Sequence, residues 1–96
     1  MTTQRSMKAI QIHEYGGRQT LRHEQIAIPE ITGDEVLIQV LNTSVNPVDW
    51  KVRDGLLADA GVHQLPLTLG WDVAGRIASV GSDVTGLNIG DEVYAL

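Results

Sequence analysis

The chain of 96 residues contains no cysteine. This absence excludes disulfide bridges and every metal site that depends on a thiolate ligand. Basic residues are also few, because 7 lysines and arginines stand against 12 acids and give a formal net charge of -5. The bases are scattered singly, whereas nucleic-acid binders normally carry a basic patch. The composition therefore argues against a nucleic-acid partner.

Long apolar runs are missing as well. The stretch Val36-Leu37-Ile38 ends at Gln39, far short of the roughly 20 residues that a membrane-spanning helix needs. Residues 1–6 carry a charge without an apolar run behind it, so they do not form a signal peptide. We interpret residues 1–6 as a disordered leader, and we predict a cytoplasmic protein with no membrane contact.

Short apolar stretches bounded by turn residues predict a mainly β protein. One short helix is expected near residues 46–54, with Asn46 as its cap, Pro47 in its first turn and Gly55 as its stop. Gly75 marks a bend or a close backbone approach inside a strand. The expected fold is a small, partly open barrel or a sandwich, with a loop or broken helix at 56–69 and strands at 7–13, 21–28, 35–41, 72–80 and near the chain end.

The residues alone show no complete active site. The histidines at 13, 23 and 63 are too scattered for a metal-ligand motif. The serines lack a nucleophile motif, and the glycines form no phosphate-binding loop. No metal site is therefore predicted.

Two local clusters remain, and each permits two interpretations. The helix start joins Asn46 and Asp49 to Trp50, Lys51 and Arg53. It is either an anion-attracting helix end or a capped helix with a solvated basic side. The second cluster, Leu69-Gly70-Trp71-Asp72, is either an aromatic residue packed in the core or part of a site.

These clusters belong to a series of motifs that resembles a known family. The series runs Pro29-x₃-Gly33-Asp-Glu-Val-Leu-Ile, Val45-Asn-Pro-Val-Asp49 with Arg53-Asp-Gly55, Leu69-Gly-x-Asp-x-Ala-Gly75, Val80-Gly81 and Gly90-Asp-Glu-Val93. Together these segments resemble the N-terminal GroES-like domain of the medium-chain dehydrogenase/reductase superfamily. Within it, the chain is most similar to the zinc-independent quinone oxidoreductase branch. The resemblance covers residues 7–96 and implies a GroES-like, partly open β-barrel.

The resemblance implies a function for the complete enzyme. It would transfer hydride from NADPH or NADH to a quinone or a conjugated enone. Asn46 would face the nicotinamide and the substrate as the catalytic residue, and Lys51 would also bind the cofactor. Trp50, Trp71 and Asp72 would line or support the substrate cleft. Asp49 and Arg53 would serve the scaffold, through the cap and a structural ion pair.

The departures from the family pattern carry further expectations. Zinc alcohol dehydrogenases have a Cys ligand at the position of Asn46 and Gly-His-Glu at Gly70-Trp71-Asp72, so the resemblance implies no zinc. The glycine fingerprint of a Rossmann cofactor domain is absent from these 96 residues. We therefore expect an incomplete GroES-like domain at residues 7–96, inactive by itself, whose unpaired strand edges favour pairing between copies. The alternative is a stand-alone, non-catalytic GroES-like module that binds a protein partner.

Overall fold

The computed structural model describes residues 5–60 and 64–96, which form two compact units. The first unit contains the described residues up to Ile28 together with Val45–Trp71. The second unit contains Pro29–Ser44 and Asp72–Leu96. The chain therefore passes from one unit to the other after Ile28, after Ser44 and after Trp71.

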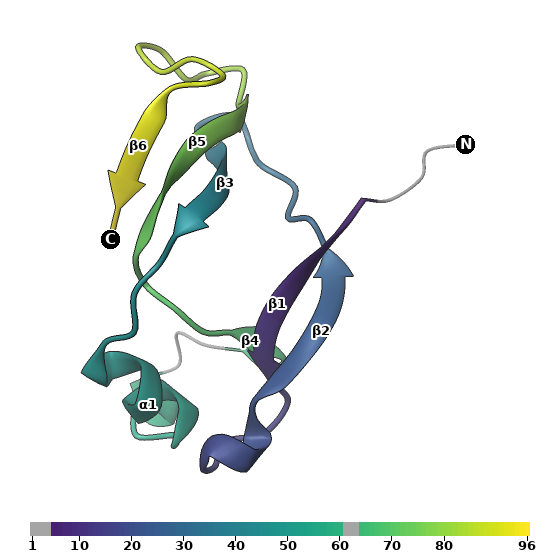
Figure 1. The fold of residues 1–96 in the computed structure, drawn as a ribbon, viewed down its shortest axis with the longest axis vertical. Helices are drawn as coiled ribbons and strands as arrows, with labels where there is room; N and C mark the ends of the chain where they lie inside the picture. Colours follow the sequence, from purple (N-terminus) through teal and green to yellow (C-terminus); the bar gives the residue numbers. More distant parts are fainter. Residues whose placement is uncertain (1–4, 61–63) are drawn as a thin grey trace. The chain divides into compact units, whose positions relative to one another are not determined.

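The first unit is built on an antiparallel sheet with strand order β2-β1-β4 (Figure 1). Strand β1 (Ser6–Ile12) pairs with β2 (Arg22–Ala27) along its length and with the short β4 (Leu67–Thr68) at its end. The short 3₁₀ turns η1 (Arg18–Thr20) and η2 (Ala58–Ala60) lie in its loops. Ile12 is fully buried and Ala9 is nearly so. Because alternate residues of a strand face the same side, Ala9 and Gln11 share one buried face of β1, whereas Ile12, three residues after Ala9, is buried on the opposite face.

Helix α1 (Pro47–Arg53) belongs to the same unit and has the expected ends. Asn46 and Asp49 form a capping box, and Pro47 opens the first turn. Gly55 follows the helix with φ +87°, a conformation that favours glycine. The backbone N–H of Gly16 donates to the carbonyl of Arg53 at 2.9 Å, which ties the loop after β1 to the end of the helix.

The second unit is an antiparallel sheet with strand order β3-β5-β6 (Figure 1). Its strands are β3 (Val36–Asn42), β5 (Val73–Val80) and β6 (Glu92–Ala95). The pairing of β3 with β5 shifts register twice, which marks bulges. Ile77 in the central strand β5 is 2% exposed and is the buried centre of this unit.

The structure confirms a mainly β fold with one short α-helix and open sheets. It corrects some boundaries. Ser6, expected in the leader, begins β1, and Arg5 beside it accepts a hydrogen bond from the N–H of Ile28. Strand β4 lies inside the predicted loop 56–69, where two residues are too short to show a periodic pattern. His63 and residues 1–4 lie outside the described residues.

A turn leads into the last strand, β6. The N–H of Asn88 donates to Asp91 Oδ2 at 2.9 Å, and the N–H of Asp91 donates to the carbonyl of Asn88 at 3.0 Å. These bonds close a turn, so that β6 starts only at Glu92. Across residues 5–60 and 64–96, no helix has the length and apolar character required to cross a bilayer.

Candidate functional site

Helix α1 presents a cation beside an aromatic ring. Trp50 is 46% exposed, and the ammonium of Lys51 lies 5.8 Å from the centroid of its ring. At this distance the two side chains make a cation–π contact. Asn46 sits half-buried at the start of the same helix. Three of the predicted site residues therefore come from one short segment.

Two other residues of the segment hold the helix in shape, as predicted. Asp49 Oδ2 accepts the backbone N–H of Asn46 at 2.8 Å, which fixes the backbone of the predicted catalytic residue. The other oxygen, Asp49 Oδ1, is buried without a hydrogen-bond partner in the described part of the chain. Arg53 forms an ion pair with Asp54 at 3.0 Å. The predicted cap at Asp49 and an ion pair at Arg53 are therefore both present.

Trp71 is not a core residue. It is 50% exposed, so the interpretation of this aromatic residue as core packing is wrong. Gly70 directly before it has φ +114°, and apart from its two chain neighbours no described residue has an atom within 4 Å of the position that a Cβ would take there. A glycine turn in open space thus delivers Trp71 to the surface of the first unit.

Asp72, the first residue of the second unit's later segment, is bound by two hydroxyl side chains. Ser44 Oγ donates to Asp72 Oδ2 at 2.5 Å, and Thr43 Oγ1 donates to the backbone carbonyl of Asp72 at 2.7 Å. Sequence reasoning missed both partners. The available signal was their place, two adjacent hydroxyl residues just before Val45-Asn46.

The predicted site residues are therefore divided between the units. Asn46, Trp50, Lys51 and Trp71 belong to the first unit, and Asp72 belongs to the second. No group of three or more His, Cys, Asp or Glu side chains in the described ranges could hold a metal ion. His13, just after β1, instead makes a hydrogen bond through Nε2 with Oε1 of Glu24 in β2, at 2.5 Å.

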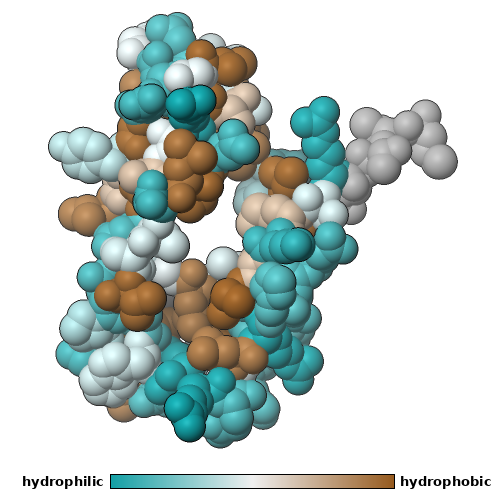
Figure 2. Space-filling view, viewed as in Figure 1, coloured by the Kyte–Doolittle hydropathy of each residue, from teal (hydrophilic) through white to brown (hydrophobic). Residues whose placement is uncertain are grey.

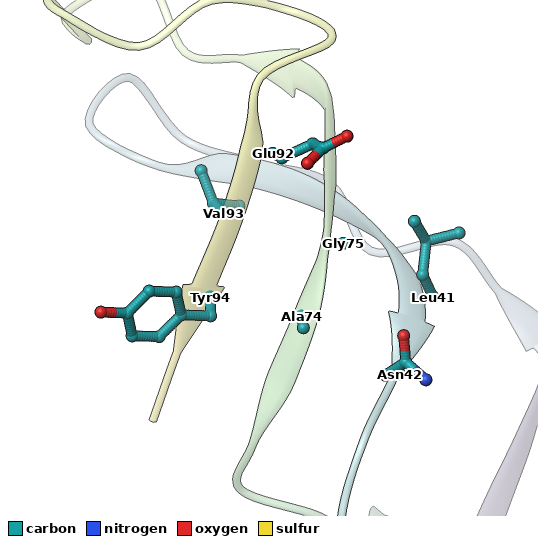
Figure 3. A pocket seen from close by; sticks show the side chains of 7 residues that line it. All are labelled: Leu41, Asn42, Ala74, Gly75, Glu92, Val93 and Tyr94. Carbon is teal, nitrogen blue, oxygen red and sulfur yellow. The ribbon is translucent and has the colours of Figure 1, made fainter.

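A separate open pocket of about 420 Å³ lies on the second unit (Figure 3). Figure 3 shows the Tyr94 ring pointing away from β5, while the Glu92 side chain leans over the sheet. None of the predicted site residues lines this pocket, whose lining is Leu41, Asn42, Ala74, Gly75, Glu92, Val93 and Tyr94. Apolar side chains are also exposed around it, and Figure 2 shows brown residues on the visible surface of this unit.

Comparison with known proteins identifies the type of domain. Residues 32–96 match the family model of the alcohol dehydrogenase GroES-like domain. The chain is 47% identical over 92 residues to the chloroplastic NADPH-dependent alkenal/one oxidoreductase of Arabidopsis thaliana, covering 95% of this chain and 24% of that protein.

Two solved structures support the same assignment. The quinone oxidoreductase from Coxiella burnetii matches with a TM-score of 0.87 and 38% identity, over 94% of this chain and 29% of that one. A cobalt- and zinc-bound thermostable alcohol dehydrogenase from Pyrobaculum aerophilum matches with a TM-score of 0.82 and 30% identity, over 94% of this chain and 26% of that one. The expected GroES-like fold is confirmed. The chain spans about a quarter of the length of these proteins.

Proposed function

Because the chain belongs to the alcohol dehydrogenase GroES-like domain family, we propose that it is the substrate-side domain of an NADPH-dependent oxidoreductase. The complete enzyme would transfer hydride to a quinone or a conjugated enone. The observation that carries this proposal is the presentation of Asn46, Trp50 and Lys51 by the single short helix α1. The relative at 47% identity, an NADPH-dependent alkenal/one oxidoreductase, supports this substrate class and this cofactor.

The side chains of this segment fit one end of a nicotinamide cofactor. Lys51 is exposed and carries the charge that suits phosphate or ribose oxygens. The Asn46 side-chain oxygen accepts the backbone N–H of Asp49 in the capping box, and the amide nitrogen is the donor end of the group. NADPH, when bound, supplies the hydride. No described residue forms a glycine-rich pyrophosphate cradle, so the isolated chain is expected to be inactive and to bind the cofactor weakly.

The other roles of this domain are to orient the substrate and to stabilise the negative charge that develops on its oxygen. The Asn46 amide would donate a hydrogen bond to the oxygen on which negative charge develops. The half-exposed indoles of Trp50 and Trp71 would bound the cleft and exclude water from it, and Asp72 would support the cleft wall. Conjugation of the substrate carbonyl already polarises the hydride acceptor, so orientation can supply much of the rate.

Zinc independence is part of the proposal. Asn46 and Trp71 stand at positions where zinc alcohol dehydrogenases carry ligands, and neither an amide nor an indole is an ordinary zinc ligand. One structural relative is nevertheless bound to cobalt and zinc. Metal analysis of the active protein, and its turnover after treatment with a chelator, test this point directly.

The proposal also covers the cellular location of the protein, its partners and its self-association. We expect a cytoplasmic protein whose ligands are small molecules, with no nucleic-acid or membrane partner, and whose copies pair through strand edges. The charge of -5 supports the exclusion of nucleic acid. The relative named above is chloroplastic, so cell fractionation is the test of the location.

The test of the function is a chimera in which residues 1–96 replace the matching part of the Arabidopsis oxidoreductase. We expect NADPH-dependent reduction of an enone. Asn46→Ala should lower kcat by roughly 100-fold, the usual effect of removing one donor to a developing oxyanion. Lys51→Glu should raise KM for NADPH about tenfold, equivalent to about 1.4 kcal/mol of binding.

Lys8→Glu is the matched charge reversal, on an exposed position of β1. It should leave both kinetic constants unchanged. Wild-type kinetics in both the Asn46 and Lys51 variants would overturn the assignment of the site. A chimera that folds and binds NADPH without turnover would favour the non-catalytic module instead.

A further inference from the structure

We infer that Ser44 and Asp72 form a positioning pair that fixes the two chain segments carrying Asn46 and Trp71. The kinetic consequence of this inference rests on the proposed function. The structural consequence does not, because it concerns only how the chain is held.

Both ends of the pair are defined by hydrogen bonds. Ser44 Oγ donates to Oδ2 of the Asp72 carboxylate at 2.5 Å. Thr43 Oγ1 donates to the backbone carbonyl of the same residue at 2.7 Å. One bond therefore holds the side chain of Asp72 and the other holds its backbone. All three residues lie within the second unit.

The pair joins the entrance and the exit of the chain segment that carries most of the predicted site. The chain enters the first unit at Val45 and leaves it after Trp71. Asn46 is two residues beyond Ser44, and Trp71 immediately precedes Asp72. Successive Cα atoms are about 3.8 Å apart, so a bond between Ser44 and Asp72 limits how far the backbones of Asn46 and Trp71 can separate.

The pair adds to contacts that already hold its neighbours, since Asn42 pairs with Ala74 where the two segments leave the sheet. Gly70 before Trp71 adopts φ +114°, a backbone conformation that favours glycine. On the other side, the Asp49 carboxylate fixes the backbone N–H of Asn46 to the helix. Ser44 and Thr43 then fix the residues that lead into this cap. A loss of the pair should loosen Trp71 and the approach to Asn46 while the helix itself persists.

If Asp72 acts by positioning, its side chain needs only a hydrogen-bond acceptor. If it acted on the substrate by its charge, it would need the negative carboxylate. The Ser44 hydroxyl needs an acceptor at position 72, and the amide oxygen of asparagine supplies one. Asp72→Asn should therefore keep the pair, whereas Asp72→Ala and Ser44→Ala should break it. Small misplacements of a reacting group are costly, since about 1 Å can reduce the rate by about 100-fold.

The experiment uses the chimera described above and separates kcat from KM. Ser44→Ala and Asp72→Ala should each lower kcat about tenfold, a loss of orientation that corresponds to about 1.4 kcal/mol in the barrier. KM for NADPH should change little, because Lys51 is untouched. Ser44→Thr and Asp72→Asn should retain most of kcat. The loss in the double alanine variant should be smaller than the product of the two single losses, because both changes remove the bond that the two side chains share.

Ser82→Ala is the control, since Ser82 is an exposed turn serine of the same unit. Wild-type kcat in Ser44→Ala would overturn the inference. Equal losses in Asp72→Asn and Asp72→Ala would also overturn it, because charge and not the hydrogen bond would then matter. Thermal unfolding of every variant shows whether a loss of kcat comes from unfolding of the protein.

A wild-type chimera without turnover would count against the proposed function alone. In that case, amide NMR of the 96-residue chain still tests the pair. Ser44→Ala should shift the resonances of Asn46 and Trp71, and Ser82→Ala should leave them in place. If Ser44→Ala leaves those two resonances unmoved, the pair does not position the segments.

Discussion

At the scale of the residue, Gly75 shows how closely two strands approach. A Cβ on Gly75 would overlap the backbone carbonyl of Gln39 in the neighbouring strand β3. This glycine is required for space, since its φ lies outside the left-handed region. The sequence signal, a glycine inside an apolar strand, correctly predicted a close backbone approach.

Gly75→Ala should therefore destabilise the second unit. The added methyl group must push β3 away from β5, and overpacking of this kind costs about 2 kcal/mol. Ala78→Ser, at an exposed position of the same strand, is the control and should change the free energy of unfolding little. Urea unfolding followed by circular dichroism measures both. Equal stability of Gly75→Ala and the wild type would mean that the strands can separate freely.

At the scale of the element, α1 is the part of the fold that depends most on local sequence. Its cap, its first-turn proline, its acidic N-terminal turn and its glycine stop all lie within ten residues, 46–55. A helix of seven residues is too short to be stable on propensity alone. Its ends and its buried Val52 must therefore hold it in place.

Removal of the acidic half of the capping box tests this dependence. Asp49→Ala deletes the acceptor of the Asn46 N–H and should lower the free energy of unfolding by about 1 kcal/mol. Asp59→Ala removes the same charge from an exposed position and should have a much smaller effect. Denaturant unfolding monitored by tryptophan fluorescence reports both values. Equal effects of the two variants would assign the loss to charge and not to the cap.

Elements made by distant residues were the ones that sequence reasoning missed. The α1 boundaries and the principal strands were predictable because their signals are local. The pairing of Leu67 and Thr68 with β1 was not, since nothing in two residues identifies a distant partner. The bond between Ser44 and Asp72 spans 28 positions and likewise has no local signature. The site residues on α1 were named from motif order, and their grouping on a single helix follows from its caps.

At the scale of the whole molecule, the buried core is small. In the part of the chain that the structure describes, four apolar side chains are buried: Ala9, Ile12, Val52 and Ile77. Large apolar residues meanwhile remain exposed on the edge strands of the second sheet. Val40 and Leu41 in β3 are 57% and 56% exposed, and Tyr94 in β6 is 87% exposed. Exposed edges with apolar side chains favour pairing with another strand.

We therefore expect the chain to self-associate through β6 as its concentration rises. Tyr94→Lys should weaken the association about tenfold, because a charge on an edge strand opposes pairing, and tenfold corresponds to about 1.4 kcal/mol. Leu87→Lys introduces the same charge at an exposed apolar residue outside the strands and should have less effect. Sedimentation equilibrium measures the association constants. A wild-type chain that is monomeric at every concentration would contradict the expectation.

The three passages of the chain between its units have a consequence for any attempt to study one unit alone. The first unit needs the residues up to Ile28 and Val45–Trp71, and the second needs Pro29–Ser44 and Asp72–Leu96. Neither is an uninterrupted stretch of the gene. A chain truncated after Trp71 would retain β3 and lose both β5 and β6. Isolation of either unit therefore requires a new linker between its two segments or a permuted order of the chain.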